Sequence, residues 1–480
     1  MVEDGKKGKR EGERGTGENV CNSHVRGVSR HLSELCEIQA QKTWPANERT
    51  TTPNIEESEL LVFDDDVETE EVLRSLSKGE YADEKDAFYV VDLGDIVRKH
   101  LRWLGALPRV WPFYAVKCNN TQTIVHTLAT LGTGFDCASK AEIALVQSLG
   151  VSADRIIYAN PCKQASHVRY AAEHGVNLMT FDNDAELHKV ARVNPNARLV
   201  LRIATDDSKS MYKLSRKFGA SVESSHQLLE TAQGLGLLVV GVSFHVGSCC
   251  QDVVTYTEAI ANARQVFNNA AELGLRLTLL DIGGGFPGHN GESKFTFEEI
   301  AAVVNSALDT HFPAGCGVNI IGEPGRYYVK SALTLAANVI AKKSFVNPLA
   351  DSEGQPAHMY YINDGNFGSF NFVFFKEKCT PPVALKRVEP EEPLFESSVW
   401  GPTCDGLDCV MERTQLLELH VGDWLLFRNM GAYTLTLSSG FNGFPLPNIH
   451  YMIGDAEWSL LVKESKDQES MSSLNLKNGN

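Results

Sequence analysis

The sequence lacks any apolar run long enough to span a bilayer, and its amino terminus lacks the apolar core of a signal peptide. It has no C-x-x-C pair: the eleven cysteines are scattered, and only Cys249 and Cys250 are adjacent. Basic residues are outnumbered, with 45 Lys and Arg against 61 Asp and Glu and a formal net charge of −16. These absences argue against a membrane protein, a metal centre, a disulfide framework and a general nucleic-acid binder. We therefore expect a cytoplasmic protein with reduced thiols, in which a local basic pocket could still hold one anionic ligand.

The composition of the two ends differs from that of the rest. Apolar residues make up 43% of the chain and charged residues 22%, which is enough to build a large core. Residues 1–50 begin with a charged, Gly-rich stretch that has little to bury, so we expect a disordered leader there. The polar residues 463–480 are expected to form a flexible tail.

Short apolar runs alternate with helical patterns between residues 93 and 331. Five of these runs begin at residues 113, 134, 156, 178 and 199, at intervals of 21 or 22 residues, and three more begin at residues 239, 277 and 318. The intervals place apolar residues at i, i+3 and i+4 and end in Gly or Asn-Pro, as amphipathic helices do. Eight strands separated by helices predict an α/β protein with a (β/α)8 TIM barrel over residues 93–331. An open doubly wound sheet has the same local pattern and stays an alternative at this point.

After residue 326 the pattern changes to strand-like runs joined by connections rich in Pro, Gly and charge. The runs cover residues 333–345, 358–364, 369–375, 423–427 and 432–437. They predict a mostly antiparallel β domain over residues 332–462. Residues 51–92 are expected to contribute to it, chiefly through the apolar run at 86–94.

Polar residues recur at the carboxyl ends of the predicted barrel strands, where barrels of this kind build their active sites. Ionisable groups at so many buried strand ends are costly unless they converge on a ligand. A single polar residue at a strand end can also have a purely structural role; Asn160 and Asp182, for example, could cap the next helix. The residues at the strand ends are Lys117, Asp136, Asn160, Asp182, Arg202, His245, Ser248, Gly283, Gly284, Gly285, Glu323 and Arg326.

Lys117 ends the first predicted barrel strand, among apolar and aromatic neighbours. Desolvation there would lower the pKa of its amine and favour the neutral form that bonds to a carbonyl. The alternative is an ion pair with Asp136 or Glu142.

A second cluster suggests a phosphorylated cofactor. Gly283 to Gly288 match G-x-G-x-x-G, but Pro287 and a polar loop follow instead of a helix, so the glycines fit a phosphate better than a dinucleotide. Arg326 and Ser248 could complete that anion site. Glu323 could hold a pyridine nitrogen protonated, and His245 could stack on the ring, although a lone His on an apolar strand can also be a core residue.

The β domain adds the segment WGPTCDGLD, in which Cys404 and Asp405 lie between Pro and Gly and are therefore expected on a loop. A thiol can move a proton, and a carboxylate can bind an ammonium group. Asp364 and Tyr433 occupy similar Gly-bordered turns, for which ordinary turn chemistry is the alternative.

With these residues assembled, the chain resembles the eukaryotic ornithine decarboxylases, pyridoxal-phosphate enzymes that make putrescine. The motifs PFYAVKCN, GFDCASKAE, YANPCKQ, SFHVGS, LDIGGGFPG, EPGRYYV, YINDG, WGPTCDGLD and NMGAYT carry the resemblance over residues 85–455. It implies an alanine-racemase-type barrel, L-ornithine as substrate, no metal, and a head-to-tail homodimer with shared active sites.

The resemblance also implies roles for single residues. Lys117 would bond the cofactor aldehyde, His245 would stack on the ring, and Glu323 would pair with its nitrogen. Cys404 would protonate the substrate carbon, and Asn363, Asp364 and Asp405 would bind substrate, with Cys404 and Asp405 arriving from the other subunit. The other expected cofactor-binding residues are Asp136, Arg202, Ser248, Gly283, Gly284, Gly285, Pro324, Gly325, Arg326 and Tyr433.

The competing hypothesis is an antizyme inhibitor, a catalytically inactive relative in the same family that binds the regulatory protein antizyme. The retained catalytic residues favour an enzyme, but two positions depart from the family pattern: Cys249 replaces a glycine and Phe367 a tyrosine. The segment 162–189 matches the family's antizyme contact and is expected to be basic through Lys163, Arg169 and Lys189. The alternative for this segment is an exposed pair of barrel helices.

Overall fold

The computed structural model describes residues 60–63, 67–78, 85–346, 356–386 and 392–465. All of these belong to one unit, residues 47–480. The predicted disordered leader, residues 1–50, lies outside the described residues, as do residues 466–480 of the predicted tail. A helix over residues 455–465 extends into the start of that tail.

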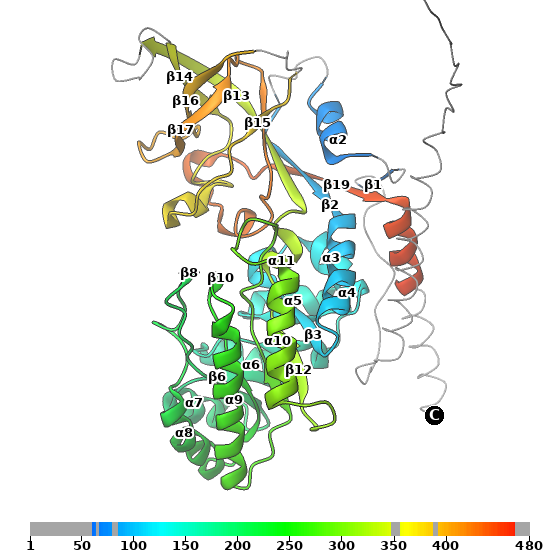
Figure 1. Cartoon of the computed structure of the whole chain (residues 1–480), viewed down its shortest axis with the longest axis vertical. Helices are drawn as coiled ribbons and strands as arrows, with labels where there is room; N and C mark the ends of the chain where they lie inside the picture. Colours follow the sequence, from blue (N-terminus) through cyan, green and yellow to red (C-terminus); the bar gives the residue numbers. More distant parts are fainter. Residues whose placement is uncertain (1–59, 64–66, 79–84, 347–355, 387–391, 466–480) are drawn as a thin grey trace, which may run out of the picture. The chain divides into compact units, whose positions relative to one another are not determined.

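Eight parallel strands close into a barrel (Figure 1). They are β3 (Val110–Ala115), β4 (Gly134–Cys137), β5 (Ile156–Tyr158), β6 (Leu178–Phe181), β7 (Arg198–Arg202), β9 (Leu238–Ser243), β11 (Leu279–Asp281) and β12 (Asn319–Gly322). Pairing of β12 with β3 closes the ring, which confirms the predicted barrel and excludes the open sheet. The barrel interior is filled by apolar side chains from six strands: Phe113, Ile157, Val200, Val240, Leu279 and Ile321.

The helices between the strands begin where the sequence supplies side-chain caps. Asn183 and Ser221 each accept a hydrogen bond from a backbone N–H in the first turn, and Thr296 forms a capping box with Glu299. The main helices around the barrel are α3 (Leu93–Ala106), α4 (Gln122–Thr130), α5 (Lys140–Ser148), α6 (Ala165–Glu173), α7 (Asp184–Val193), α8 (Val222–Gly234), α9 (Val254–Glu272) and α10 (Phe297–His311). Across the described ranges, none of the helices combines the length and the apolar content needed to cross a bilayer.

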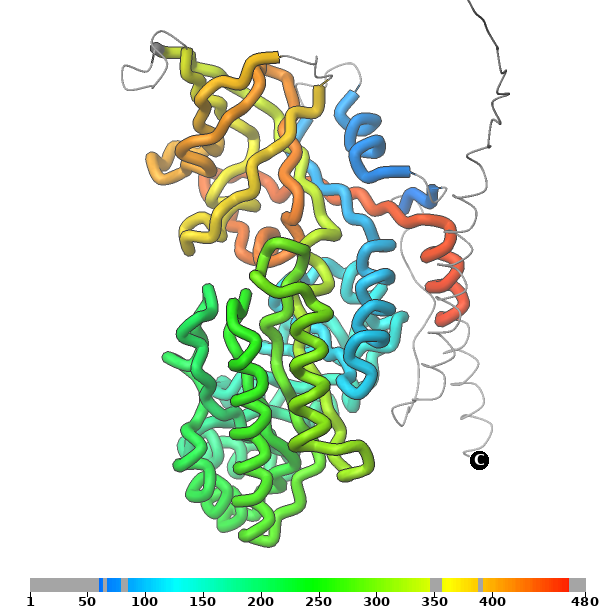
Figure 2. Tube along the Cα trace, in the orientation of Figure 1, coloured from blue at the N-terminus to red at the C-terminus, as the bar shows by residue number. Residues whose placement is uncertain are grey.

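The second sheet is mixed and largely antiparallel, in the order β1-β19-β2-β13-β14-β16-β17, with β15 and β18 attached through β13. Its strands are β1 (Leu60–Phe63), β2 (Phe88–Asp92), β13 (Leu333–Val346), β14 (Pro356–Ile362), β15 (Val383–Ala384), β16 (Leu394–Trp400), β17 (Cys409–Leu417), β18 (Trp424–Phe427) and β19 (Asn448–Gly454). Figure 2 shows the blue β2 and the red β19 running side by side, as their parallel pairing requires. The domain boundaries themselves stay predictions.

Two predicted strands in this domain are wrong. Residues 369–375 contain a short 3-10 helix, η4 (Asn371–Phe375), although Phe370, Phe372 and Phe374 recur at the period of a strand; within η4 only Phe372 is buried, and the left-handed Lys376 ends it. Residues 432–437 contain η5 (Leu435–Leu437) instead. There Tyr433 has a φ of 55°, a left-handed conformation that ends any extended strand.

Candidate active site

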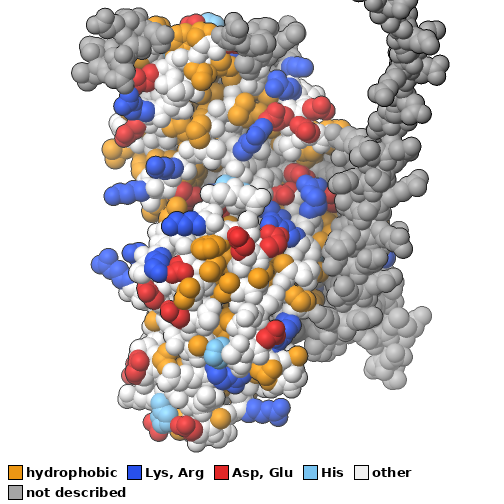
Figure 3. Space-filling model, viewed as in Figure 1, with side chains coloured by type: hydrophobic (Ala, Val, Ile, Leu, Met, Phe, Trp, Pro, Cys, Tyr) orange, Lys and Arg blue, Asp and Glu red, His pale blue; other side chains and the backbone are white. Residues whose placement is uncertain are grey.

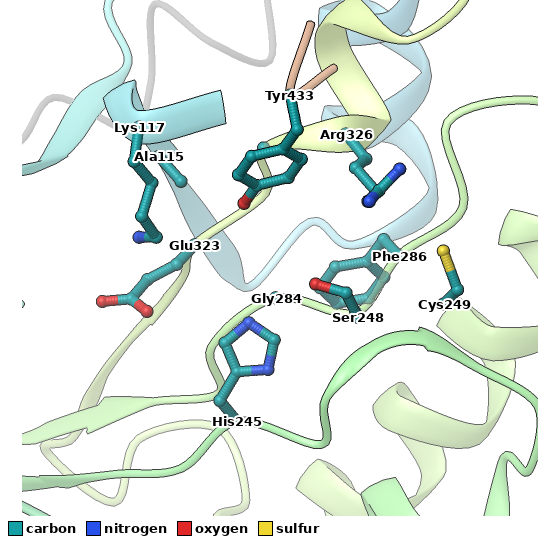
Figure 4. Close-up of a pocket in the computed structure, with 12 residues that line it drawn as sticks. Ala115, Lys117, His245, Ser248, Cys249, Gly284, Phe286, Glu323, Arg326 and Tyr433 are labelled. Atoms are coloured by element: carbon teal, nitrogen blue, oxygen red, sulfur yellow. The ribbon is translucent and has the colours of Figure 1, made fainter. Parts of the chain in front are cut away.

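One pocket gathers twelve residues where the barrel strands end (Figure 4). Lys117 lies in the turn η2 (Val116–Cys118) after β3, and Arg326 begins the short helix α11 (Arg326–Val329) after β12. Tyr433 enters from the loop that follows β18, and its N–H donates to the carbonyl of Cys118 in η2 at 2.9 Å. The complete lining is Ala115, Lys117, His245, Ser248, Cys249, Gly284, Gly285, Phe286, Glu323, Gly325, Arg326 and Tyr433.

Lys117 donates a hydrogen bond from Nζ to Oδ2 of Asp136, whose side chain is fully buried. Burial would lower the pKa of Lys117, but the carboxylates of Asp136 and Glu323 outweigh it and raise that pKa above its ordinary value. The expectation of a lowered pKa is therefore wrong, and the ion-pair alternative with Asp136 holds. The Lys117 amine is therefore charged at neutral pH.

Glu323 points its carboxyl group into the pocket (Figure 4). Burial, and then the charges of Asp136 and Asp281, raise the pKa of Glu323 well above its usual range. Asp281 lies beneath it at the end of β11, where burial raises its pKa to about 7. Sequence reasoning missed Asp281; its signal was a carboxylate inside a buried strand, separated from three glycines by Ile282 alone.

His245 follows β9, with its ring on one side of the pocket. Its Nδ1 accepts a hydrogen bond from the N–H of Gly247 at 3.0 Å, which leaves the ring proton on Nε2. Burial, together with the positive charges of Arg202 and Lys117, lowers the pKa of His245 well below its usual range. The pocket therefore presents a neutral imidazole. A Cβ at Gly284 would lie 3.0 Å from Nε2, so a side chain there would displace the imidazole ring.

Arg326 occupies the opposite end of the pocket from Lys117 (Figure 4). Its guanidinium lies between the rings of Tyr212 and Tyr433, 5.2 and 4.9 Å from their centroids. Both terminal nitrogens donate to Glu377, at 3.1 and 3.0 Å, and Glu292 lies 3.6 Å away. Neither carboxylate was singled out from the sequence. Glu377 stands between two lysines and Glu292 between Gly and Ser, and both surroundings are typical of a solvated turn.

The remaining predicted cofactor residues support the pocket from outside its lining. Arg202 lies with its guanidinium 5.1 Å from the ring centroid of Phe218. Gly283 accepts a hydrogen bond from the N–H of Glu323 at 2.6 Å, and the carbonyl of Pro324 accepts one from Ala115 at 3.2 Å. These contacts fix the backbone that carries the pocket residues.

The predicted substrate residues lie in loops that follow β14 and β16 of the second sheet, and they do not line this pocket. Asn363 hydrogen-bonds to the backbone of Asn338 and Lys85, which is a structural role. Burial raises the pKa of Asp364 to about 6, and its Oδ2 has no hydrogen-bond partner among the described residues.

Cys404 is exposed, and Asp405 accepts a hydrogen bond from the N–H of Leu407, within the same loop. Neither residue reaches the pocket of its own chain.

Asn160 and Asp182 also lie outside the pocket. Asn160 accepts from the N–H of Cys162, and Asp182 accepts from Gly219 at 2.8 Å. The N-cap of helix α7 is Asn183. The alternative that Asp182 caps this helix is therefore wrong, because the cap is the next residue along the chain.

Comparison with known proteins identifies this arrangement. Residues 93–330 match the model of the pyridoxal-dependent decarboxylase family, pyridoxal binding domain. Ornithine decarboxylase of Mus musculus is 55% identical over 412 residues, covering 85% of this chain and 89% of that protein. Antizyme inhibitor 2 of Xenopus laevis is 58% identical over 392 residues, covering 81% and 85%.

The chain belongs to the ornithine decarboxylase and antizyme inhibitor family. The family resemblance seen in the sequence is thereby confirmed. Among solved structures, the arginine decarboxylase of Paramecium bursaria Chlorella virus bound to agmatine superimposes with a TM-score of 0.74 at 35% identity, covering 80% of this chain and 100% of that one. Relatives of both kinds, decarboxylases and antizyme inhibitors, are similarly close to this chain.

Proposed function

We propose that this chain is an ornithine decarboxylase that uses pyridoxal phosphate to convert L-ornithine into putrescine and carbon dioxide. The supporting observation is the convergence of five side chains on one pocket: Lys117, His245, Glu323, Arg326 and Tyr433. An amine, a neutral imidazole, a carboxyl group and a guanidinium are the groups that a phosphorylated pyridine aldehyde requires.

Buried polar atoms in the pocket and on Asp136 beside it fit that cofactor. Glu323 Oε1, Asp136 Oδ1 and Arg326 Nε have no hydrogen-bond partner within the described residues. A Cβ at Gly284 would lie 2.8 Å from the backbone carbonyl of Glu323 and 3.0 Å from Nε2 of His245, so the glycine keeps the space between these two residues clear. Buried polar atoms without partners are costly unless a ligand satisfies them.

Each residue then has a task. When bound, the pyridine ring of the cofactor accepts the electron pair that departing carbon dioxide leaves behind. Lys117 would hold the aldehyde, Asp136 would hold the Lys117 amine in place, and Glu323 would hold a proton at the ring nitrogen. His245 would cover one face of the ring without adding charge, because it is neutral.

The substrate end requires a second subunit. Cys404 would donate a proton to the carbon that has lost its carboxylate, and Asp364 and Asp405 would bind the distal ammonium. Because Cys404 and Asp405 do not reach the pocket of their own chain, we propose a homodimer in which each subunit supplies them to the other. An unpartnered Asp364 oxygen fits a ligand cation.

An antizyme inhibitor is the second candidate. It is favoured by the 58% identity to antizyme inhibitor 2 of Xenopus laevis and by the pairing of Glu377 with Arg326, which occupies a guanidinium that the cofactor phosphate would need. Antizyme is in either case the expected regulatory partner.

The expected antizyme contact, residues 162–189, needs one correction. Lys163 is buried and does not belong to a basic surface; its Nζ lies 2.9 Å from Oε1 of Glu186. Arg169 remains exposed. On the face shown in Figure 3, basic and acidic side chains are interspersed.

The cytosol is the compartment we propose, because the nine cysteines of the described residues are free thiols.

Carboxyl-labelled ornithine distinguishes the two functions. The enzyme should take up pyridoxal phosphate with a visible absorbance band and release labelled carbon dioxide, and Lys117→Ala should lose both. An antizyme inhibitor would release no label at any cofactor concentration. Lys209→Ala is a matched control, because that amine lies exposed in a pair with Asp252 and outside the pocket lining.

A further inference from the structure

Glu377 connects the second sheet to Arg326, at the end of the candidate site where the proposed cofactor would place its phosphate. It follows η4, where Lys376 takes a φ of 64° and turns the chain inward. Its side chain is only 8% exposed. Both carboxylate oxygens are used: they accept from Arg326, from Lys330 at 2.6 Å and from the hydroxyl of Tyr212 at 2.6 Å.

The charges around Arg326 cancel. Arg326 and Lys330 supply two positive groups, while Glu377 and Glu292 supply two negative ones, with Glu292 3.6 Å from Arg326 and 3.7 Å from Lys330. A phosphate site normally keeps a surplus of positive charge and a guanidinium with its paired nitrogens free. Here both terminal nitrogens of Arg326 already bind a carboxylate.

Cys249, at the position where the family usually has glycine, belongs to the same cluster. Its φ of 53° is a left-handed conformation that suits glycine, so the backbone keeps the family's shape despite the side chain. Its thiol donates to Oε1 of Glu292 at 3.6 Å. Burial raises the pKa of Cys249 to about 12, so this side chain adds no charge to the cluster.

We propose that Glu377 is an internal competitor for the cofactor phosphate, which makes it the residue that sets how strongly this chain prefers pyridoxal phosphate to pyridoxal. The inference rests on the proposed cofactor site. For phosphate to bind both terminal nitrogens of Arg326, Glu377 must leave them, and the released carboxylate must also give up Lys330 and Tyr212. Pyridoxal has no phosphate, so its binding leaves Glu377 in place.

Glu377 could instead serve only to attach η4 to the barrel. That role predicts an effect on stability but none on the choice between the two ligands. The ratio of two dissociation constants, measured on the same folded protein, therefore separates the two roles.

The test compares wild type with Glu377→Gln, which keeps the shape and removes the charge. Equilibrium dialysis gives the dissociation constants for pyridoxal phosphate and for pyridoxal, and inorganic phosphate serves as a competitor. We expect Glu377→Gln to bind pyridoxal phosphate roughly tenfold more tightly and pyridoxal within about twofold of wild type, because one charge opposing the phosphate is removed. Inorganic phosphate should compete better against the variant.

Glu396→Gln is the matched control, because Glu396 forms an exposed pair with Arg413 and should change neither constant. Should Glu377→Gln fail to fold, Glu377→Asp keeps the charge but shortens the reach to Arg326 and should give a smaller tightening. Unchanged affinity for pyridoxal phosphate, or equal tightening of both ligands, overturns the inference. The proposed function fails on a different measurement, the absence of labelled carbon dioxide from cofactor-loaded wild type.

Discussion

Asp136 holds Lys117 through Oδ2, while its Oδ1 has no hydrogen-bond partner in the described part of the chain. The carboxylate is fully buried, so water screens its effect on the amine only weakly. Together with Glu323, it raises the pKa of Lys117, against the effect of burial. The amine must lose a proton before it bonds to an aldehyde, so Asp136 both positions and restrains Lys117.

Asp136→Asn should lower the pKa of Lys117, because one of the two carboxylates that raise it is removed. Borohydride trapping of pyridoxal on Lys117, followed across pH, should then rise at lower pH than in wild type. Asp309→Asn, in an exposed pair with Arg109, should leave the profile unchanged. A profile that stays in place in Asp136→Asn would show that the ion pair does not control the amine.

Glu377 should stabilise the unliganded protein at neutral pH and lose that effect in acid. Burial acts in the opposite direction, but Arg326 and Lys330 lower the pKa of Glu377 to about 2. A depressed carboxyl pKa stabilises the fold above the ordinary value near 4.5 and ceases to do so as the pH falls towards 2. Glu377→Gln should therefore cost about 2 kcal/mol at pH 7, and the difference should shrink below pH 4.5.

Melting temperatures of the unliganded proteins at pH 7 and pH 3.5 measure this. The exposed pair of Glu396 and Arg413 supplies the comparison, because such pairs contribute less than about 1 kcal/mol. A difference between wild type and Glu377→Gln that grows in acid would contradict the assignment.

Shared active sites predict recovery of activity from two inactive variants. Lys117→Ala and Cys404→Ala homodimers should each be nearly inactive in forming putrescine. Random mixing makes about half the dimers heterodimers, each with one site in which both residues are intact, so activity should approach about a quarter of wild type. Sites built within single chains would recover nothing after subunit exchange.

The barrel can be predicted from the sequence because its first five strands recur at intervals of 21 or 22 residues, helical patterns separate all eight, and a parallel repeat has few ways to close. Ionisation cannot be predicted in this way, because it depends on neighbours that only the fold brings together. Lys117 looks desolvated in its own strand, yet Asp136 of the next strand reverses the direction of its pKa shift. Glu377 looks like a surface residue until the turn at Lys376 directs it to Arg326.

Lys163 shows the same limit on the surface. It looks like an exposed charge beside Cys162, but its Nζ donates to the carbonyls of Thr180 and Asn160, and its side chain is fully buried against Glu186. Burial lowers the pKa of Lys163, and only Glu186 opposes that effect strongly. Lys163→Glu would place a second negative charge beside a buried carboxylate, so it should lower the melting temperature and abolish binding of any partner through misfolding.

Arg169 is the variant that tests the antizyme contact. It lies exposed on α6 and is not needed for the core, so Arg169→Glu should keep the wild-type melting temperature and cofactor uptake. If antizyme binds this segment, reversing the charge should weaken the complex roughly tenfold, because a rim charge acts through long-range attraction as well as contact. Titration calorimetry at two salt concentrations measures the long-range and the contact contributions to affinity, since added salt should narrow the difference in affinity between wild type and variant.

Arg198→Glu is the control, because Arg198 is also exposed but begins β7, outside the segment 162–189. Equal affinity of wild type and Arg169→Glu at low salt would mean that α6 is an ordinary exposed barrel helix, and the antizyme contact would have to be sought elsewhere on the chain.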